Sequence, residues 1–519
     1  MRAAGLLVVI LGTLGLIACG NDDDPESGER DGSDAGPDES GGGGGVVPQT
    51  VSCEPSSGTV YHVSTSGDDE AAGTAEAPWQ TVARGVTALS AGDTLYIGEG
   101  VYAEQVIVTQ SGTEAEPILI ASEPTGGKAE INGQSVSLDE DGLVSIVGAS
   151  HIRLCSLTIR QSANHGVSVQ DSDDGDVPTD VSVVGLSVFD SDNAGIHVED
   201  ADTVVIEDNL TRESVTSGIG VWYSNQVAVR NNEVVNARND DERGHEEWIS
   251  IAGVCDFEVA DNELYMDDPD FEGHSGIDAK ESSCRGSIHH NYIHDFPGYG
   301  GQIYLDAWEA GLEGTGTLSR IDIYANRLDT AGGITVGSEE GGTVEHVRVF
   351  NNTIYHPWTS GIQISDLNRD GPKHDINIFN NTIWGTRNHG TSGIYLLSTN
   401  ITDVVVQNNI VVMDPERVVG LITAGSEAVL AELTVDHNIV SGPTECSNDY
   451  PDCVEVSTWD GNQSIDPLLV DGEGRDLRLR EGSPAIDQGV DIDGLTTDFD
   501  GTDRPQGQGV DIGAFEFQP

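Results

Sequence analysis

An asparagine that recurs roughly every 29 residues constrains the fold of this chain more than any other feature. Each copy follows an alternating, β-branched run and precedes a further apolar residue. The copies are Asn209, Asn232, Asn262, Asn291, Asn326, Asn352, Asn381, Asn409 and Asn438. A period of roughly 20–50 residues is typical of solenoids, propellers and other arrays. Each period contains two or three short alternating runs and no helical pattern, so the repeated unit consists of strands.

These strands are expected to form an all-β solenoid, a right-handed parallel β-helix with one coil per repeat. An Asn at a fixed place in each coil can turn the chain in the left-handed region, and its side-chain amide can bond to the next Asn. Coils would then stack at about 4.8 Å per repeat. A propeller is the alternative, but its blades need four antiparallel strands with hairpin signals. The sequence shows neither.

The chain divides into four segments of different composition: residues 1–19, 20–50, 51–445 and 446–519. The third segment holds the repeat. Near its start, Val82, Val86 and Leu89 are spaced as on a helix. We expect a short helix to cap the first coil there and the last segment to form a C-terminal cap, because the end coils of a solenoid otherwise expose their apolar core.

The first 19 residues are expected to be a targeting signal. The apolar run from Leu6 to Ala18 is too short to span a bilayer as a helix. Leu16-Ile17-Ala18-Cys19 resembles a bacterial lipobox, which implies cleavage before Cys19 and acylation of its thiol. An ordinary secretory signal is the alternative. By resemblance to enteric lipoproteins, we expect an exported chain that a lipid anchors in the outer membrane or at the cell surface, with residues 20–50 as a disordered tether.

The charge of the chain limits its partners. It has 89 acidic and 23 basic residues, a net charge of −66, and only nine of the acids lie in the tether. Such a surface repels nucleic acid and anionic lipid, so no nucleic-acid partner is expected. Capture of a polyanionic glycan would need bound cations or high salt. We expect a monomer.

Six cysteines follow Cys19, and an even number in an exported chain is typical of disulfides. Cys255 and Cys284 each lie seven residues before a ladder asparagine. They are therefore expected side by side on adjacent coils, about 4.8 Å apart, which is within bridging range. Cys446 and Cys453 are expected to close a short loop, and the remaining two pair by elimination. No Cys–His spacing resembles a zinc site.

Two regions resemble known families. Residues 92–102 and 117–120 resemble the opening segment of secreted β-helix proteins of the pectate-lyase-like superfamily. That resemblance implies carbohydrate chemistry on a parallel β-helix. Residues 466–469, 482–487 and 511–516 resemble a segment called a choice-of-anchor Q domain. The second resemblance implies surface proteins as relatives and does not imply a reaction.

Ionisable and aromatic residues gather between residues 274 and 308. Aligned on the Gly-Ile step, the outward positions of successive strands form two columns. One column contains Glu199, Trp222, Ala252, Lys280, Asp306, Gly337 and Ser365, and the other contains His197, Gly220, Ser250, Asp278, Tyr304, Thr335 and Gln363. A parallel β-helix lays such columns out as a groove along its axis, which suits an extended polysaccharide. The expected sugar-stacking platforms are Trp222, Tyr223, Tyr304 and Trp308.

The strand Gly276-Ile277-Asp278-Ala279-Lys280 resembles, in outline, the strand of calcium-dependent β-helix lyases that carries a basic lysine. The resemblance implies that Lys280 takes the proton α to a uronate carboxyl group, while Ca²⁺ neutralises that carboxylate. The ion would be held by Asp267, Asp268 and Asp270, or by Asp278 and Asp306. The lyases set their calcium acids at a different spacing from the lysine. Two aspartates beside Lys280 would also keep it protonated unless a metal occupied them.

Two other functions are compatible with the same residues. A glycoside hydrolase would use two carboxylates, drawn from Asp278, Asp306, Glu281 and Glu339. A non-catalytic glycan-binding or adhesive protein would use Lys280 only as an ion-pair partner of the two aspartates. The sequence specifies neither the sugar nor the linkage.

Overall fold

The computed structural model describes residues 47–49, 52–237, 247–268, 275–296, 302–308, 316–338, 341–366, 370–385, 391–413, 418–442, 446 and 452–518. Residues 1–41 and 42–519 are separate units, and the following concerns the second. Cys19 and most of the expected tether lie outside the described residues. Among the described residues, no helix is both long enough and apolar enough to cross a bilayer.

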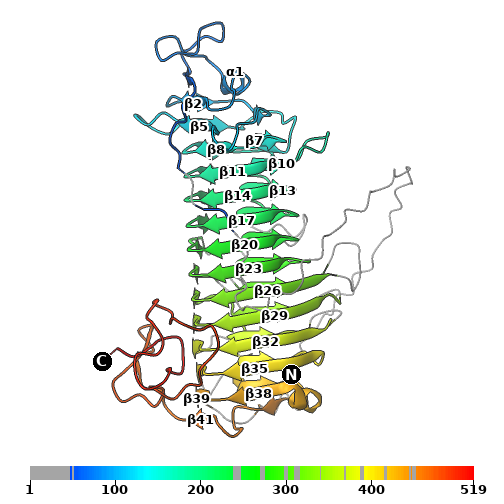
Figure 1. The fold of residues 1–519 in the computed structure, drawn as a ribbon, viewed down its shortest axis with the longest axis vertical. Helices are drawn as coiled ribbons and strands as arrows, with labels where there is room; N and C mark the ends of the chain where they lie inside the picture. The colour runs from blue at the N-terminus through cyan, green and yellow to red at the C-terminus, as the bar shows by residue number, and fades with distance from the viewer. Residues whose placement is uncertain are drawn as a thin grey trace, which may run out of the picture. The chain divides into compact units, whose positions relative to one another are not determined.

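Three sheets wind around one core, and each coil contributes one strand to each sheet (Figure 1). The first sheet contains β1 (Val60–Val63), β2 (Thr94–Ile97), β5 (Ile118–Ser122), β8 (Ile152–Cys155), β11 (Thr179–Val184), β14 (Asp202–Glu207), β17 (Asn225–Arg230), β20 (Cys255–Ala260), β23 (Cys284–His289), β26 (Thr317–Tyr324), β29 (Thr343–Phe350), β32 (Lys373–Phe379), β35 (Ile401–Gln407) and β38 (Leu433–Asp436). The second contains β4 (Val106–Val108), β7 (Gly142–Val147), β10 (His165–Gln170), β13 (Ile196–Glu199), β16 (Ile219–Trp222), β19 (Ile249–Ala252), β22 (Ile277–Lys280), β25 (Ile303–Asp306), β28 (Ile334–Gly337), β31 (Ile362–Ile364), β34 (Thr391–Leu396), β37 (Val418–Ala424) and β40 (Val454–Glu455). The third contains β3 (Val101–Tyr102), β6 (Glu130–Asn132), β9 (Thr158–Arg160), β12 (Ser187–Phe189), β15 (Leu210–Arg212), β18 (Glu233–Val235), β21 (Glu263–Tyr265), β24 (Tyr292–His294), β27 (Arg327–Asp329), β30 (Thr353–Tyr355), β33 (Thr382–Trp384), β36 (Ile410–Val412), β39 (Ile439–Ser441) and β41 (Gln463–Ser464).

Strands of successive coils pair in parallel within each sheet, as between β22 and β25, while β40 runs antiparallel to β37. The coils stack in chain order from β1 to β41. The predicted fold class, an all-β parallel β-helix, is confirmed, and the propeller is excluded. Two short helices, α1 (Val82–Val86) and η1 (Glu427–Glu432), and one antiparallel hairpin of β42 (Leu469–Asp471) and β43 (Asp476–Leu479) complete the described elements.

The interior of the coils is filled by aliphatic side chains. On β22, Ile277 and Ala279 are fully buried in this core. Because side chains alternate along a strand, Asp278 and Lys280 lie on the outer face of the second sheet. The helix α1 covers the first coil, where Val82 and Val86 are buried (Figure 1).

The asparagine ladder forms as predicted and continues for one more residue. Each side-chain amide donates to the carboxamide oxygen of the next ladder residue at 2.9 or 3.0 Å, from Asn209 to Asn462. The sequence pattern did not predict Asn462 as a ladder residue, because Asn462 follows Gly461 and not a β-branched run.

One part of the ladder prediction was wrong. The residue in the left-handed region is the one before each ladder asparagine, such as Asp208, Ala325 and His437, with φ of 59°, 51° and 53°. The ladder asparagine must direct its amide into the corner of the coil, toward the next coil. The preceding residue therefore makes the change of direction.

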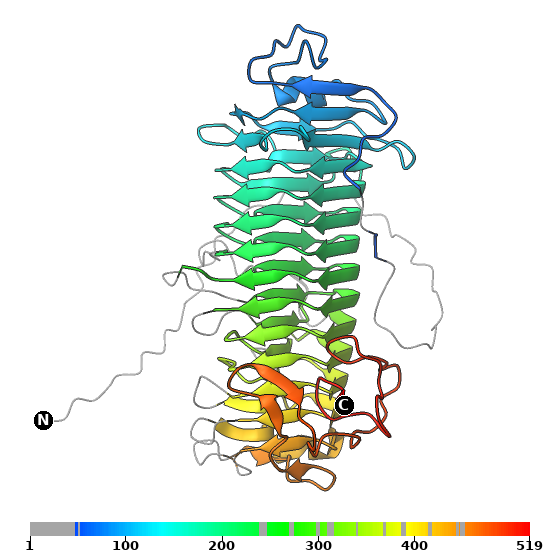
Figure 2. The ribbon, with the colours of Figure 1, turned by 90° about the vertical axis from the view of Figure 1, so that its left-hand side faces the viewer.

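The part of the chain that follows β41, here called the C-terminal segment, lies along the flank of the last coils (Figures 1 and 2, red). The side chains of Asn351, Asn380 and Asn408 each donate to a backbone carbonyl of this segment, at 2.8, 2.9 and 2.8 Å. All three occupy the left-handed corner position of successive coils. The segment also packs Ile512 and Phe515 into a small apolar cluster with the third sheet.

Three disulfides join the six cysteines. Cys255 and Cys284 are register partners at the start of β20 and β23, with their Cα atoms 4.5 Å apart. Cys446 is bonded to Cys453. The third disulfide connects Cys155 on β8 to Cys53, which precedes the first strand. One disulfide therefore joins two adjacent coils, and another joins the residues before the first strand to the coil that contains β8.

Candidate functional site

The outward face of the second sheet carries the predicted columns. Lys280 pairs with Asp306, and Asp278 pairs with Tyr304, in the register of β22 and β25. The other positions follow in the predicted order through Gly337 and Gln363. The alignment on the Gly-Ile step is thereby confirmed. It brings Asp278, Lys280 and Asp306 together on two adjacent strands.

A fourth ionisable group completes this arrangement. The Nζ atom of Lys280 donates to Oε2 of Glu247 at 2.9 Å. All four side chains are largely withdrawn from solvent, with residue exposures of 7% for Glu247, 2% for Asp278, 8% for Lys280 and 6% for Asp306. We call these four residues the carboxyl cluster. Three carboxyl groups and one amine therefore share a poorly hydrated volume.

Asp278 is the most perturbed member of the carboxyl cluster. Burial raises the pKa of its carboxyl group well above the usual value, and the neighbouring Glu247 and Asp306 raise it further. A hydrogen bond with Glu247 favours the protonated form, whereas Lys280 opposes it. The Oδ1 atom of Asp278 has no hydrogen-bond partner among the described residues. Asp278 is thus a buried carboxylic acid that retains its proton at a pH where an exposed aspartate is ionised.

The sequence analysis missed Glu247 as a member of the site. Its sequence context predicts a position in a loop over the second sheet. In the structure, Glu247 is buried and lies two residues before β19, immediately ahead of the buried Trp248. The equivalent positions of other coils are small residues, including Ser217, Ser275 and Ser360. A glutamate in a column of small residues was the signal that could have identified it.

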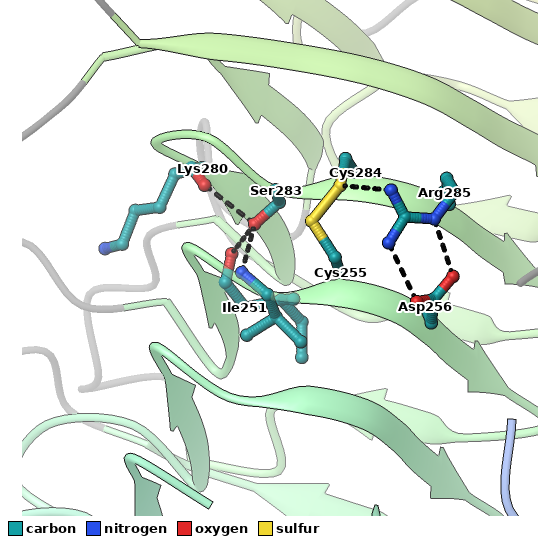
Figure 3. Close-up of a disulfide and its surroundings, with 8 residues drawn as sticks. Ile251, Cys255, Asp256, Lys280, Ser283, Cys284 and Arg285 are labelled. Atoms are coloured by element: carbon teal, nitrogen blue, oxygen red, sulfur yellow. Dashed lines mark hydrogen bonds and ion pairs between the residues drawn. A yellow bond between two sulfur atoms is a disulfide. The ribbon is translucent and has the colours of Figure 1, made fainter. Parts of the chain in front are cut away.

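Hydrogen bonds of the Ser283 side chain hold the turn that follows Lys280. The Ser283 hydroxyl donates to the carbonyls of Lys280 at 2.8 Å and Ile251 at 3.2 Å, and it accepts from the amide of Val254 at 3.1 Å. Figure 3 shows the Lys280 side chain extending away from the adjacent Cys255–Cys284 disulfide. These bonds link the coil of Lys280 to the preceding coil.

The four predicted aromatic platforms have different surroundings. Tyr304 is buried beside Asp278, with its ring over Gly337, where an added Cβ would lie 2.8 Å from the ring. Trp222 and Trp308 are half-buried. Tyr223 is 44% exposed, lies at a corner outside the strand, and donates its hydroxyl to Glu281 at 3.3 Å. Trp222 and Tyr304 thus lie on strands of the second sheet, as the aspartates and Lys280 of the carboxyl cluster do, whereas Tyr223 and Trp308 follow the ends of β16 and β25.

Histidines continue the outer face of the second sheet beyond Trp222. The ring of His197 stands edge-on to Trp222, with centroids 5.1 Å apart, and stacks on His165 at 4.3 Å. Burial, with a smaller effect from His197, lowers the pKa of His165 to about 3, so this ring is neutral. The Nε1 atom of Trp222 has no hydrogen-bond partner among the described residues. This end of the second sheet therefore contains a neutral imidazole ring, that of His165, and an indole N–H group without a protein acceptor among the described residues.

Of the first set of expected calcium ligands, the structure describes Asp267 and Asp268. Asp267 follows β21 of the third sheet and accepts from the side chains of Arg212 and Asn236. Asp268 is half-buried nearby, and Asp270 lies outside the described residues. No group of three or more acidic, His or Cys side chains suited to a metal ion occurs in the described ranges. Asp267 is thus engaged by an arginine and an amide. Calcium binding stays a prediction.

Comparisons with known proteins bear on the fold. Residues 61–247 match a family model described as a Pel9A-like, right handed beta helix region. The crystal structure of the Dettilon tailspike protein superposes with a TM-score of 0.51 over 72% of this chain and 70% of that chain, at 14% identity. The fold is that of the pectate-lyase-like β-helices. The matched region of this β-helix ends at Glu247 and so excludes Asp278, Lys280 and Asp306.

Two curated proteins align with parts of the chain. The uncharacterized protein YwoF of Bacillus subtilis is 34% identical over 117 residues, which is 22% of this chain and 25% of that protein. Pectate lyase PEL9 of Emericella nidulans is 25% identical over 236 residues, 44% of this chain and 45% of that protein. The chain thus spans less than half the length of either relative.

Proposed function

We propose that this chain is a carbohydrate-active enzyme that hydrolyses a polysaccharide with the carboxyl cluster as its catalytic centre. The observation that carries the proposal is the buried Asp278, whose pKa is raised by burial and by its neighbours, beside Glu247, Lys280 and Asp306. Catalytic acids need a pKa shifted toward the working pH, and burial next to like charges produces that shift.

Stability alone gives no reason for such a cluster. Each buried ionisable group loses several kcal/mol of hydration, and uncharged residues can fill the same outward positions at no such cost. Serine, alanine, threonine and glycine occupy the corresponding sites of the neighbouring strands β19 and β28. A cluster that costs stability on the outer face of the second sheet supports a role in chemistry.

The chemistry follows from the protonation states. Asp278 donates its proton to the glycosidic oxygen as the bond to the anomeric carbon breaks. Asp306 accepts a proton from the water molecule whose oxygen bonds to that carbon. Glu247, which accepts from Lys280, keeps the proton on Asp278 until substrate arrives. Trp222 and Trp308 provide apolar surfaces for the adjoining sugar rings.

A neutral glycan suits this groove better than an acidic one. The chain carries a net charge of −66, and the single amine of the carboxyl cluster is paired with Glu247. A polyanion would therefore approach against a repulsive field.

β-Elimination of a uronate-containing glycan, with Ca²⁺, is the second candidate. The Pel9A-like family match and the similarity to pectate lyase PEL9 favour it. Lys280 would then be the base. In the structure, however, Lys280 donates to a carboxylate, which is the opposite of accepting a proton.

Product analysis distinguishes the two reactions. The purified chain is incubated with xylan, mannan, cellulose and starch fragments and with polygalacturonate and alginate, with and without Ca²⁺. We expect new reducing ends on a neutral glycan without ultraviolet-absorbing unsaturated products. Lys280→Arg should keep part of this activity, because it preserves the cation beside Glu247. Unsaturated products that require Ca²⁺ and Lys280 would establish the lyase reaction instead, and binding without any product would refute catalysis.

We also propose that Cys19 carries lipid and that the chain is displayed at the cell surface. The lipobox-like sequence before Cys19 supports this location. Cys19→Ser should release the protein from the membrane fraction. Retention of that variant in the membrane would refute the lipid anchor.

A further inference from the structure

A cavity lies away from the carboxyl cluster, between the third sheet and the C-terminal segment. Its volume is about 420 Å³. One wall is formed by β27 and β30, and the other by the β42–β43 hairpin with Phe499 and Phe515. Pockets of a few hundred Å³ that combine apolar walls with a few polar groups are typical of small-molecule sites. None of the residues of the carboxyl cluster contributes to it.

The charges that line this cavity balance one another. Arg327, Arg475 and Arg478 face it together with three aspartates, Asp329, Asp476 and Asp500. Equal numbers of positive and negative side chains are unusual in a chain with 89 acidic and 23 basic residues. Three of the 23 basic residues are thus concentrated at this one place. A ligand with a net charge of either sign would gain little here.

Asp329 is the buried polar group of this cavity. Its side chain is fully buried, and Oδ2 accepts from Nη1 of Arg475 at 2.6 Å and lies 3.5 Å from Arg327. Its Oδ1 atom has no hydrogen-bond partner in the described part of the chain. A buried carboxylate oxygen without a donor is costly, so a donor from the cavity would stabilise it. A hydroxyl group is a donor that brings no charge.

Aromatic rings complete the lining. Phe499 and Phe515 lie with their centroids 5.2 Å apart and their planes at 54°, and Tyr355 stands opposite under the guanidinium of Arg475 at 5.3 Å. The Tyr355 hydroxyl is already used, because it donates to the carbonyl of Glu473 at 3.0 Å. The rings therefore offer apolar surface, while Arg478 and Asp329 offer hydrogen bonds.

We propose that this cavity is a second, non-catalytic glycan-binding site that takes one or two residues of a neutral saccharide. Sugar rings present apolar C–H faces to aromatic side chains and hydroxyl groups to arginine and aspartate. The C-terminal segment would then hold glycan against the β-helix independently of the reaction at the carboxyl cluster. This inference does not rest on the proposed hydrolysis, because the two sites share no residue.

Calorimetric titration tests the site. The probes are the tetrasaccharides of cellulose, xylan, mannan and starch, with tetragalacturonate as the acidic comparison. Titrations use the full chain carrying Asp278→Asn, which suppresses turnover of the probe. Asp329→Asn keeps the shape of the side chain but removes its charge, and Arg478→Gln changes a residue whose side chain is 60% exposed. Asp180→Asn is the matched control, because Asp180 pairs with Arg153 on the first sheet, far from this cavity.

We expect one neutral tetrasaccharide to bind, with at least a tenfold loss of affinity in Asp329→Asn and in Arg478→Gln and a change below twofold in Asp180→Asn. Equal affinity in all three variants would place the binding elsewhere and overturn the proposal. Preference for tetragalacturonate, or no binding by any probe, would also overturn it. In the background with Asp278 intact, Asp329→Asn should leave the cleavage of short soluble substrates unchanged, so failure here is distinguishable from failure of the proposed hydrolysis.

Discussion

Replacement of a single ladder asparagine should open the β-helix locally. Asn326 is fully buried at the corner of its coil. Its Oδ1 accepts from the backbone amide of Asn291 at 3.1 Å and from the side-chain amide of Asn291 at 2.9 Å. Its Nδ2 donates to the carbonyl of Ile288 at 2.8 Å and to Oδ1 of Asn352 at 3.0 Å. Asn326→Ala removes all four bonds at once.

The cost follows from those four bonds. A buried hydrogen bond contributes about 1 kcal/mol, so the loss amounts to ~4 kcal/mol. In a solenoid, stability is close to a sum of coil and interface contributions, so the loss should fall on the coils that contain Asn291, Asn326 and Asn352. A change of ~4 kcal/mol in the local opening equilibrium corresponds to roughly a thousandfold increase in amide exchange, because about 1.4 kcal/mol is one factor of ten.

Hydrogen–deuterium exchange with mass spectrometry measures this effect peptide by peptide. The Asn291 amide should lose its protection in Asn326→Ala, while peptides before β17 should exchange as in the wild type. Asn225→Ala is the control, since Asn225 is exposed on β17. We expect a change within about 0.5 kcal/mol there. Less than tenfold faster exchange at Asn291 in Asn326→Ala would refute the energetic role of the ladder.

Three further predictions concern other parts of the chain. Burial raises the pKa of Asp278 in the folded state, so its contribution to stability is present at low pH and is lost as pH rises from about 4 through the raised pKa. The unfolding free energy of the wild type minus that of Asp278→Asn, from urea titrations, should therefore fall with rising pH; a flat difference would contradict the shift. The double change of Cys255 and Cys284 to serine removes a disulfide that spans 29 residues and should lower the unfolding free energy by about 3 kcal/mol. A thermal midpoint equal to that of the wild type would contradict this stabilising role of the disulfide. Asn380→Ala removes bonds to the carbonyls of Asp511 and Gly513 and places alanine at φ 53°. The C-terminal segment should become protease-sensitive at a cost of about 2–3 kcal/mol, whereas unchanged resistance would mean that other contacts hold it.

The sequence was sufficient for the fold because the information is periodic. The nine asparagines define the coil length, and the Gly-Ile step defines the register, so the neighbours of Lys280 follow from the spacing of the repeat. The same register placed Cys255 beside Cys284. Periodicity could not specify residues that break the repeat. Glu247 follows a connection of different length from its neighbours, and Asn462 follows a glycine.

The chemistry of the site was less accessible from the sequence. The register placed carboxylates beside Lys280, but it could not tell which carboxylate Lys280 would bind or that burial would raise the pKa of Asp278. The acidic loop around Asp267 predicts a metal ligand there, yet the partner of Asp267 is Arg212, which precedes it by 55 residues. The cavity beside Asp329 depends on the docking of the C-terminal segment onto the third sheet. A one-dimensional repeat carries no signal for such docking.

The rate of glycan cleavage by Asp278→Asn tests the central claim most directly. On the glycan that the wild type cleaves fastest, kcat/KM is measured across pH for the wild type, for Asp278→Asn and for Asp322→Asn. Asp322 is a suitable control, because it is also buried and pairs with Arg348 on the first sheet. The account predicts that the wild-type rate falls as pH rises through the raised pKa of Asp278. It also predicts that Asp278→Asn loses roughly a thousandfold in rate, while Asp322→Asn stays within about tenfold of the wild type. An Asp278→Asn enzyme that keeps more than about a tenth of the wild-type rate would contradict general acid catalysis at the carboxyl cluster.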